Sequence, residues 1–549
     1  MMRLLRKIFV AMFAGTMLAC ILTSCEKNQT PTEKAIDEGI LLIGNSADPE
    51  SLDPSLATGF SESRIINALF EGLVGADTTT LEPKPAVAKS WKISSDRRTY
   101  TFFLDKRAKW SDGSPLTADD FVFAWLRSLN PNISAEYATM LYRIKNAERI
   151  AKAEEKDLSK FGAKVIDAHT LEIELEKPCP YFLSLLYHNI YFPLPRKTLE
   201  KFGADKFPNA IWTKPENIVS NGAFVLKKWS INNKVSVRRN PYYRAPELIK
   251  LNGIDFYPIS NINTEDRAFR AGQLHITDSI CPHRIKDILA KTPQNFRSDK
   301  WLGVYYYIFN TAKKPFDDTR VRRALTLAID RNAIIDNFLK AKQQPAYSFI
   351  PKGCGGISEP RNIPQRQDVE LAKKLLAQAG FPNGENFPII KITYNVSEQH
   401  KPIAEAIQQM WKNNLNINAE LYNLSWPAYL AARRAKDFDV ARASWIGDFA
   451  EPETFLEMFS CDSGLNHSSW KNSDFDNLLK SAENALTKQH RLNALQQAEE
   501  LMLENAPVMP IYFFSKVYQI LPCVKNWDAN LLDYHDYKGV YLKKSNDVK

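Results

Sequence analysis

One carboxylate in apolar surroundings is the first residue whose chemistry needs an explanation. Asp448 lies in the sequence SWIGDFAEP, between Trp445 and Phe449. A charge among apolar side chains is costly unless a partner neutralises it, so Asp448 requires a cation. The candidate within the chain is Arg442, but six residues of extended strand span about 20 Å. The alternatives are therefore a structural ion pair and a cation that arrives from outside.

Sequence patterns typical of catalysis are absent. The chain contains no GxSxG, HExxH, GxxxxGK[ST] or GxGxxG motif. Its eight histidines are scattered, and none stands at metal-ligand spacing from another. The run GCGG at 353–356 is rich in glycine, but no helix with a lysine follows it, so we expect a surface turn there. We predict a protein that is not an enzyme and has no cofactor or metal.

Cysteines beyond Cys25 are few and far apart. They are Cys179, Cys281, Cys354, Cys461 and Cys523. No CxxC pair occurs, so a zinc site or a thioredoxin-like motif has no support. One or two disulfides stay open as possibilities. Because the number is odd, at least one thiol must be unpaired or bonded to something else.

The N-terminus has the features of an export signal. Three basic residues within the first seven positions precede an apolar stretch at 8–22, which is shorter than the ~20 residues of a membrane span. The stretch ends in LTSC, which resembles a bacterial lipobox. We expect residues 1–24 to be a lipoprotein signal peptide and Cys25 to carry lipid, which gives an exported, periplasmic or cell-surface, membrane-anchored lipoprotein. An ordinary signal peptide with a coincidental cysteine is the alternative.

Length and charge bound the class of protein. A chain of 549 residues predicts two or three domains. The formal charge of +9 includes three basic and no acidic residues in 1–24, so the expected mature charge is +6. It is spread along the chain without a basic tract interleaved with aromatics, which argues against nucleic acid as a partner.

The elements that must position these residues differ along the chain. Short strands and turns dominate the first 270 residues, with strands expected at 40–44, 99–104, 164–167 and 170–175. Helices are predicted at 118–129, capped by Thr117 with Asp120 at the third helical position, at 321–329, and at 369–379 after Asp368. The polar segment 26–38 lacks apolar periodicity, so we expect a tether there.

Strands and helices alternate after residue 380. Apolar residues mark a strand at 390–394, a helix at 403–411 and a strand at 417–421. This βαβ order is typical of an α/β domain with a ligand crevice at the strand ends. The strand-like run FDVARA at 438–443 then leads into the segment that holds Asp448.

Several motifs resemble one family over most of the chain. In order they are LDP (52–54), LFEGL (69–73), AKSW (88–91), TYTF (99–102), KWSDGSPLTADDF (109–121), NIVSNGA (217–223), RNP (239–241), VRRAL (321–325), FDVARA (438–443) and PIY (510–512). They closely resemble the signature of the peptide-binding solute-binding proteins of ABC transporters. The resemblance implies a three-domain α/β, periplasmic-binding-protein-like fold, in which two lobes close on a ligand and a small extra domain sits on one lobe. The implied boundaries are domain I at 25–70, 198–302 and 517–549, domain II at 71–197, and domain III at 303–516.

The resemblance also implies a ligand site. Asp448 falls where the family holds the α-ammonium of a peptide, which answers the question of its cation. The other matching positions are Ser444 and Ile446 for the ligand backbone, Phe60 and Tyr137 on the other walls, Trp445 and Trp426 as aromatic walls, and Arg433, Arg442 and His400 for the peptide carboxylate. Purely structural roles are the alternatives to ligand binding: a solvated helix position for Arg433, a helix start for His400 and a core position for Trp426.

Departures from the family pattern affect both structure and specificity. Gly303 and Ile446 stand where close relatives often have two cysteines, so that disulfide should be absent, and Thr58 replaces an acidic residue near the cleft mouth. Arg434, commonly His in relatives, suggests a preference for acidic peptides, including murein peptides.

By resemblance, the expected function is that of a monomeric receptor that binds short peptides and delivers them to an ABC permease and ATPase. Alternatives are a murein-peptide or dipeptide receptor, a receptor for another solute such as nickel or haem, and a surface adhesin or exported hydrolase on this fold.

Overall fold

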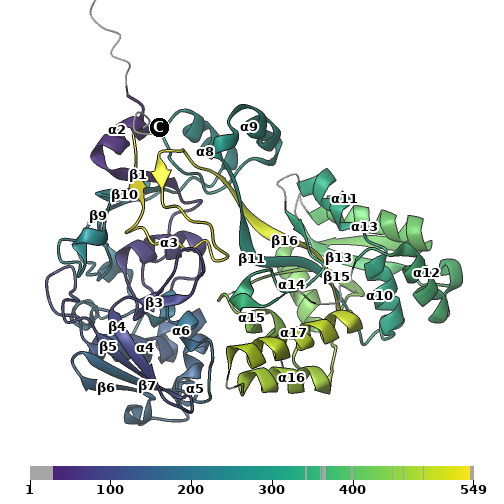
Figure 1. Cartoon of the computed structure of the whole chain (residues 1–549), viewed down its shortest axis with the longest axis horizontal. Helices are drawn as coiled ribbons and strands as arrows, with labels where there is room; N and C mark the ends of the chain where they lie inside the picture. Colours follow the sequence, from purple (N-terminus) through teal and green to yellow (C-terminus); the bar gives the residue numbers. More distant parts are fainter. Residues whose placement is uncertain are drawn as a thin grey trace, which may run out of the picture.

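The computed structural model describes residues 29–339, 343–358, 360, 366–396, 400–447, 449–461, 463–485 and 487–544. Two of the predicted functional residues, Cys25 and Asp448, lie outside the described residues, as does the side chain of Trp426. Two long strands, β11 (Phe296–Phe309) and β16 (Val508–Gln519), cross between two halves of the molecule (Figure 1). We call the described residues before β11 and after β16 lobe 1, and those between the two strands lobe 2.

Lobe 1 contains two four-stranded sheets. The first has the order β1-β10-β9-β8 and the second β4-β5-β7-β6. Their strands are β1 (Ile40–Gly44), β8 (Phe224–Ser230), β9 (Lys234–Arg239), β10 (Gly253–Tyr257), β4 (Ala88–Ile93), β5 (Thr99–Leu104), β6 (Ala163–Asp167) and β7 (Thr170–Glu174). Two small ribbons pair β2 (Val74–Ala76) with β3 (Pro83–Pro85) and β17 (Val524–Lys525) with β18 (Tyr541–Leu542). The helices are α2 (Pro31–Glu38), α3 (Phe60–Leu69), α4 (Ala118–Leu129), α5 (Ala147–Ala151), α6 (Phe182–Leu185), α7 (Arg196–Lys201), α8 (Ile262–Arg270) and α9 (Ile285–Lys291).

Lobe 2 is built on one six-stranded mixed sheet of order β12-β16-β11-β15-β13-β14. Besides the crossing strands it holds β12 (Gln344–Pro345), β13 (Ile390–Asn395), β14 (Ala419–Leu424) and β15 (Val440–Ile446). The helices are α10 (Thr319–Leu327), α11 (Arg331–Ile334), α12 (Val369–Gln378), α13 (His400–Leu415), α14 (Trp426–Ala435), α15 (Glu453–Leu456), α16 (Ser473–Glu483) and α17 (Lys488–Asn505). Because β13 runs parallel to β14 with α13 between them, the predicted βαβ unit is confirmed.

Local sequence signals explain how several elements begin. The Asp120 carboxylate accepts the backbone N–H of Thr117 at 2.8 Å, so the predicted cap of α4 is confirmed. The Asp368 side chain accepts the backbone N–H of Leu371, which confirms the predicted start of α12. In the LDP motif, Asp53 is buried and binds Arg127 of α4 at 2.7 Å, an ion pair that ties the loop after β1 to that helix.

One expectation about local structure was wrong. Residues 31–38 are helix α2, not tether, because Thr30 and Glu33 form a capping box in which the Thr30 N–H donates to the Glu33 carboxylate at 2.8 Å. The strand expected at 417–421 is present as β14, with its start shifted by two residues to Ala419. The five cysteines in the described part of the chain are all free thiols, so no disulfide forms among them.

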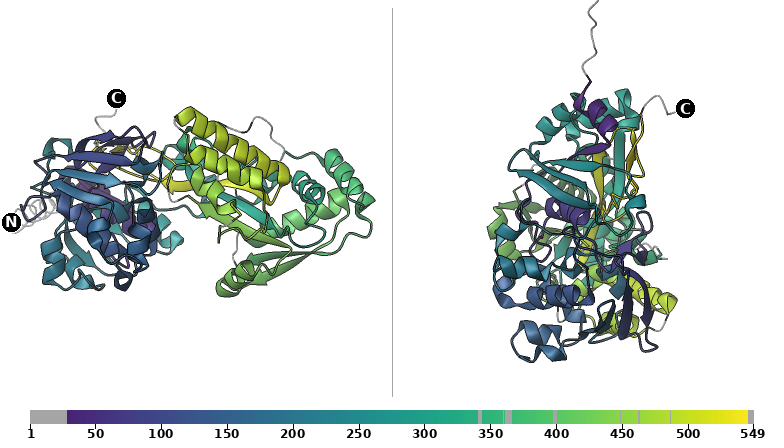
Figure 2. Two further views of the ribbon diagram at one scale, coloured as in Figure 1. Left: turned by 90° about the horizontal axis from the view of Figure 1, so that it is seen from below. Right: turned by 90° about the vertical axis from the view of Figure 1, so that its left-hand side faces the viewer.

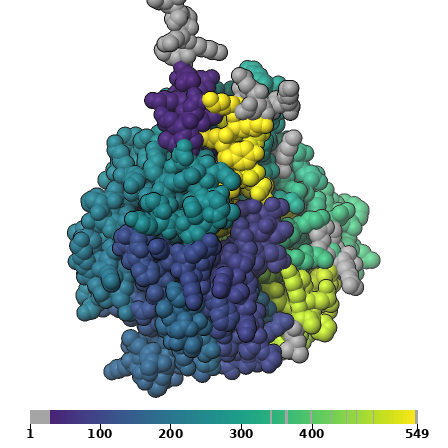
Figure 3. Space-filling model, turned by 60° about the vertical axis from the view of Figure 1, so that its left-hand side comes forward, coloured from purple at the N-terminus to yellow at the C-terminus, as the bar shows by residue number. Residues whose placement is uncertain are grey.

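The two lobes lie side by side along the longest axis of the molecule, joined in the middle by the crossing strands (Figure 2). Helix α2 sits at one end of lobe 1 beside the C-terminal segment (Figure 3), where Asp37 pairs with Lys544. One apolar cluster contains side chains of both lobes, because Leu81, Tyr187 and Leu531 of lobe 1 pack with lobe 2 residues. No helix in the described ranges is long and apolar enough to span a membrane. The predicted domain boundaries stay a prediction.

Candidate functional site

The end of β15 emerges from the core of lobe 2. Residues 440–443 are buried, whereas Ser444, Trp445 and Ile446 are half-buried. The strand pairs antiparallel with β11, with Gly303 opposite Ile446. These two positions, where the sequence predicts no disulfide, are therefore direct neighbours across the sheet. The Gly447 N–H then donates to the Leu302 carbonyl at 2.8 Å, which holds the strand end beside the crossing strand just before position 448.

One edge of β15 is available for a further strand. Strand β13 pairs with β15 only at Val440 and Ala441. Among the described strands, none continues this pairing along Arg442–Ile446, although the other edge is paired with β11 over its full length. Unpaired backbone N–H and C=O groups at a strand edge are a template for an added extended chain.

A cavity of about 290 Å³ lies between the lobes at this strand end. Phe60 and Tyr137 line it from lobe 1, and Ile446 and Gly447 from lobe 2. Three predicted site residues from distant parts of the sequence thus meet in one cavity. Phe60 is 49% exposed although it is a large apolar side chain, which is typical of a binding wall.

The lobe 1 side of this cavity has its charges already paired. Arg64 binds Asp278 at 2.6 Å and Asp533 at 2.7 Å. His188, whose ring lies 4.6 Å from that of Tyr137, is half-buried, and desolvation of the imidazole lowers its pKa to about 4, so it is neutral at pH 7. We therefore see no unsatisfied charge from lobe 1 facing the cavity among the groups described here.

Arg442 is a buried cation that has no anionic partner among the residues that the structure describes. Its side chain lies on β15, and the residue is 8% exposed. The guanidinium stacks over the Tyr305 ring at 4.7 Å, and Nη1 donates a long 3.4 Å hydrogen bond to the Asn395 amide oxygen. Its Nε has no hydrogen-bond partner, and no described carboxylate forms an ion pair with it. Burying such a charge costs several kcal/mol, by order of magnitude, unless an anion compensates it.

His400 lies in the same cluster, at the start of α13. Its Nδ1 is 3.2 Å from the Tyr305 hydroxyl. Burial, and then the charge of Arg442, lower the pKa of His400 to about 4. The imidazole is therefore neutral at pH 7 and can serve as a hydrogen-bond partner without adding charge. The predicted pair of Arg442 and His400 is thus close in space, bridged by Tyr305.

A second basic group lies on α14. Arg433 sits over the Tyr429 ring at 5.6 Å, and its Nε is buried without a partner. The Tyr429 hydroxyl in turn donates to the Arg442 carbonyl, which links the two arginines. Arg434 is exposed beside Arg433. Together these residues leave lobe 2 with more positive than negative charge near the strand edge.

His467 belongs to this basic group, and sequence reasoning missed it. Burial, and then the charges of Arg433, Lys436 and Arg434, lower its pKa to about 4, so the three cations lie near it. No local signal marks His467, because its loop reaches α14 only through the fold. Trp445 is half-buried at the strand end, where its Nε1 donates to the Thr454 hydroxyl at 3.4 Å, and its role as a pocket wall stays a prediction.

The arrangement favours binding over chemistry. Strand edge, aromatic wall and buried cations are present, whereas no cluster of three His, Cys, Asp or Glu residues suited to a metal occurs in the described part of the chain.

Comparison with known proteins identifies the family. The family model "Bacterial extracellular solute-binding proteins, family 5 Middle" matches residues 82–467. The chain belongs to this family. Its members are non-enzymatic solute-binding proteins, so the prediction that the chain is not an enzyme is confirmed.

Relatives match this family member almost end to end. The periplasmic oligopeptide-binding protein OppA of Salmonella typhimurium is 36% identical over 516 residues, which cover 92% of this chain and 93% of that protein. The periplasmic murein peptide-binding protein MppA of Escherichia coli is 37% identical over 510 residues, covering 91% and 93%. The Haemophilus influenzae OppA complex with RPPGFSPFR has a TM-score of 0.72 at 34% identity, covering 92% of this chain and 99% of that one. The predicted periplasmic-binding-protein-like α/β fold is confirmed.

The same comparisons indicate the arrangement of the lobes. The unliganded open form of MppA, a murein tripeptide-binding protein, matches with a TM-score of 0.82 at 35% identity, covering 93% of this chain and 98% of that one. Another structure of MppA gives 0.74 at 36% identity, covering 92% and 98%. Because sequence similarity is the same for both, the difference reflects conformation. The arrangement of the lobes in this structure is therefore closer to that of the open form than to that of the second MppA structure.

Proposed function

We propose that this family member is the substrate-binding protein of an ABC importer and that it binds short peptides between its lobes. The observation that carries the proposal is Arg442, a buried cation that forms no ion pair with any carboxylate in the described ranges and lies beside the neutral His400. The α-carboxylate of a peptide is an anion that every substrate would bring. Its pairing with a guanidinium out of water gives a strong charge-assisted hydrogen bond. The names of the relatives, which bind oligopeptides or murein peptides, support the same ligand class.

The rest of the site fits a ligand that is itself an extended chain. We propose that the peptide backbone adds to the open edge of β15 at Ser444 and Ile446, with Phe60, Tyr137, Trp445 and Trp426 as walls. Asp448 would hold the α-ammonium. Six residues of extended chain span at most about 20 Å, and two anchoring side chains would take up part of that span, so this pair of anchors fits peptides of roughly three to five residues. Arg433 and His400 would serve peptides of other lengths.

Isothermal titration with matched peptides tests the proposal. We expect a tetra- or pentapeptide with free termini to bind the protein without residues 1–24, and expect it to remain intact after overnight incubation. Amidation of the C-terminus and acetylation of the N-terminus should each weaken binding about 10-fold or more, since each removes one charged partner. Affinities that are indifferent to both modifications, or degradation of the peptide, would contradict the proposed function.

A preference for acidic peptides, including murein peptides, is a second candidate. Arg433, Arg434 and Lys436 concentrate positive charge around the neutral His467, and one relative is a murein peptide-binding protein. We expect Arg434→His to lower the affinity for a glutamate-containing peptide about 3- to 10-fold relative to its glutamine counterpart. Lys412→Ala, at an exposed position of α13, is the control. An unchanged ratio in Arg434→His would remove this candidate.

We also propose that the protein is anchored by lipid on Cys25 after removal of residues 1–24. Support comes from α2, which begins within six residues of Cys25 at one end of lobe 1 (Figure 3), so the anchor would leave both lobes free to move. Mass spectrometry of the N-terminal peptide should find diacylglycerol on Cys25. In Cys25→Ser the protein should be released in soluble form. Permease and ATPase subunits of the importer are the proposed protein partners of the loaded receptor.

A further inference from the structure

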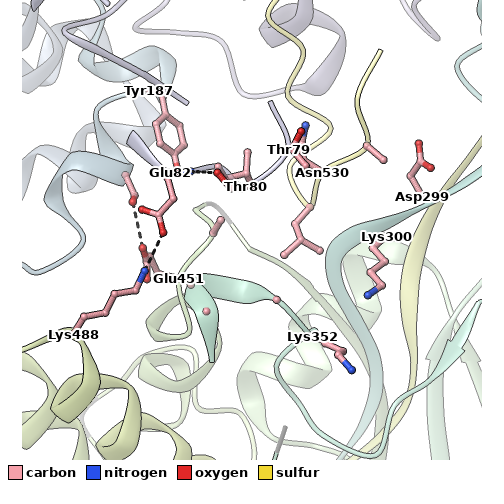
Figure 4. A pocket seen from close by; sticks show the side chains of 18 of the residues that line it. Thr79, Thr80, Glu82, Tyr187, Asp299, Lys300, Lys352, Glu451, Lys488 and Asn530 are labelled. Atoms are coloured by element: carbon pink, nitrogen blue, oxygen red, sulfur yellow. Dashed lines mark hydrogen bonds and ion pairs between the residues drawn. The ribbon is translucent and has the colours of Figure 1, made fainter. Parts of the chain in front are cut away.

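A second cavity lies at the junction of the lobes, on the other side of the segment that follows β15. Its volume is about 510 Å³. Residues 79–82 and Tyr187 of lobe 1 form one wall, and residues 353–356, Glu451 and Lys488 of lobe 2 form the other (Figure 4). The two cavities share Ser184 and Tyr187, but the first is lined by Ile446 and Gly447 and the second by Ala450 and Glu451. One short stretch of chain therefore separates them.

Two polar contacts join the lobes across this second cavity. Glu82 of lobe 1 pairs with Lys488 at the start of α17, with 3.0 Å between Oε1 and Nζ. The Ser184 hydroxyl donates to the Glu451 carboxylate at 3.2 Å. Figure 4 shows both contacts at the edge of the cavity.

Glu451, the acceptor of the Ser184 hydrogen bond, is held in place within lobe 2. Arg491 of α17, which is 3% exposed, binds Glu451 at 2.5 Å and Glu453 at 2.7 Å. Beside it, the ring of Phe449 stacks on that of Tyr181 from lobe 1, with centroids 5.1 Å apart. Glu451 cannot follow Ser184 if lobe 1 moves, because the buried arginine holds it to α17.

These contacts occur in a molecule whose lobes are arranged more like those of the open form of a relative. Closure on a ligand rotates one lobe against the other, and contacts across the junction cannot all keep their distances through such a rotation. We propose that Glu82–Lys488 and Ser184–Glu451 belong to the open arrangement, and that these four junction residues, of which only Ser184 also lines the first cavity, set the peptide affinity by opposing closure. This inference rests on the proposed function, because the affinity concerned is that for peptide.

Removing one of these contacts should strengthen peptide binding, whereas removing a side chain that contacts the ligand should weaken it. A contact present only in the open state lowers the population of the closed state, so its removal strengthens ligand binding by the same factor. Glu82 and Lys488 are 65% and 57% exposed, and exposed ion pairs are weak, so Lys488→Ala or Glu82→Ala should tighten binding about 2- to 5-fold. Ser184→Ala, which removes a more buried contact, should tighten it by a similar or larger factor.

Titration of one pentapeptide against this set of variants is the test. The control is Lys373→Ala, because Lys373 forms a comparably exposed pair with Glu370 at 2.9 Å within α12 of lobe 2. Lower dissociation constants in Lys488→Ala, Glu82→Ala and Ser184→Ala, with no change in Lys373→Ala, would support the inference. Equal or weaker binding in the three junction variants would overturn it, while binding by the unmodified protein would leave the proposed function intact.

A measurement without ligand tests the role of the junction contacts independently of the proposed function. Glu82→Lys faces Lys488 with a like charge, so small-angle X-ray scattering should show a smaller radius of gyration than for the unmodified protein. Adding Lys488→Glu restores an ion pair of reversed polarity and should restore the larger radius. An unchanged radius in Glu82→Lys would refute the inference even if no peptide bound.

Discussion

Arg442→Met gives the sharpest consequence of the proposed site. Methionine is unbranched like arginine, shorter and uncharged, and it can occupy part of the space over the Tyr305 ring. Because no described carboxylate compensates Arg442, losing the charge should leave the melting temperature unchanged or raise it. The same change should weaken peptide binding, since the ligand carboxylate would enter a buried site without its cation.

The size of this effect follows from the burial of Arg442. A hydrogen bond to a charged group contributes about 1.5–3 kcal/mol, and a carboxylate left buried and unpaired costs more. We expect a loss of about 2–4 kcal/mol, or roughly 30- to 1,000-fold in the dissociation constant, for a peptide whose C-terminus reaches Arg442.

Isothermal titration of the acid and the amide of that peptide separates charge pairing from damage to the site. In the unmodified protein the acid should bind more tightly, whereas Arg442→Met should bind both alike. The pKa of His400 should also rise in the variant, because the charge of Arg442 is one cause of its low value, and this is measurable by NMR. A persistent preference for the acid in Arg442→Met, or a strongly destabilised variant, would refute the reasoning.

Three further changes test other parts of the account. Asp448→Asn should weaken binding of a free-amine peptide about 10- to 100-fold but leave its N-acetylated form unaffected in titrations, and equal losses for both would contradict the ammonium role. Asp53→Ala leaves the buried Arg127 unpaired, so the free energy of unfolding should fall by about 3–5 kcal/mol in denaturant titrations, and a fall below 1 kcal/mol would show that the pair is dispensable. Burial raises the pKa of Glu499 to about 7 from an ordinary value of 4.5, so its contribution to stability is full below pH 4.5 and is lost as the pH rises to 7. Glu499→Gln should make the free energy of unfolding less dependent on pH between 4.5 and 7 and should stabilise the protein at pH 8. An unchanged pH dependence in this range would show that Glu499 does not cause it.

Much of the fold can be predicted from local patterns in the sequence. The capping residues of α4 and α12 and the alternation of β13, α13 and β14 depend on neighbouring residues, so they could be read directly. Helix α2 also has a readable signal in Thr30 and Glu33, which its polar composition obscured. The motifs that resemble the family do not separate structural from functional roles. Asp53 of the LDP motif, for example, stabilises the junction with α4.

The chemistry of the site depends on contacts that no local pattern contains. Arg442 is an ordinary strand residue in the sequence, and its isolation from anions follows from its position over Tyr305 of another strand. His467 reaches the basic group on α14 from a separate loop. The second cavity depends on Glu82 and Lys488, which are 406 positions apart. Such relations follow from the packing of the two lobes.

Native mass spectrometry of gently purified protein without residues 1–24, followed by denaturation and sequencing of whatever is released, tests the central claim most directly. We expect the protein to carry a mixture of short peptides with free termini, and expect Asp448→Ala and Arg442→Met to carry far less. An unmodified protein that arrives empty and takes up no added peptide would contradict the account, and Asp448 would then require a structural partner within the chain.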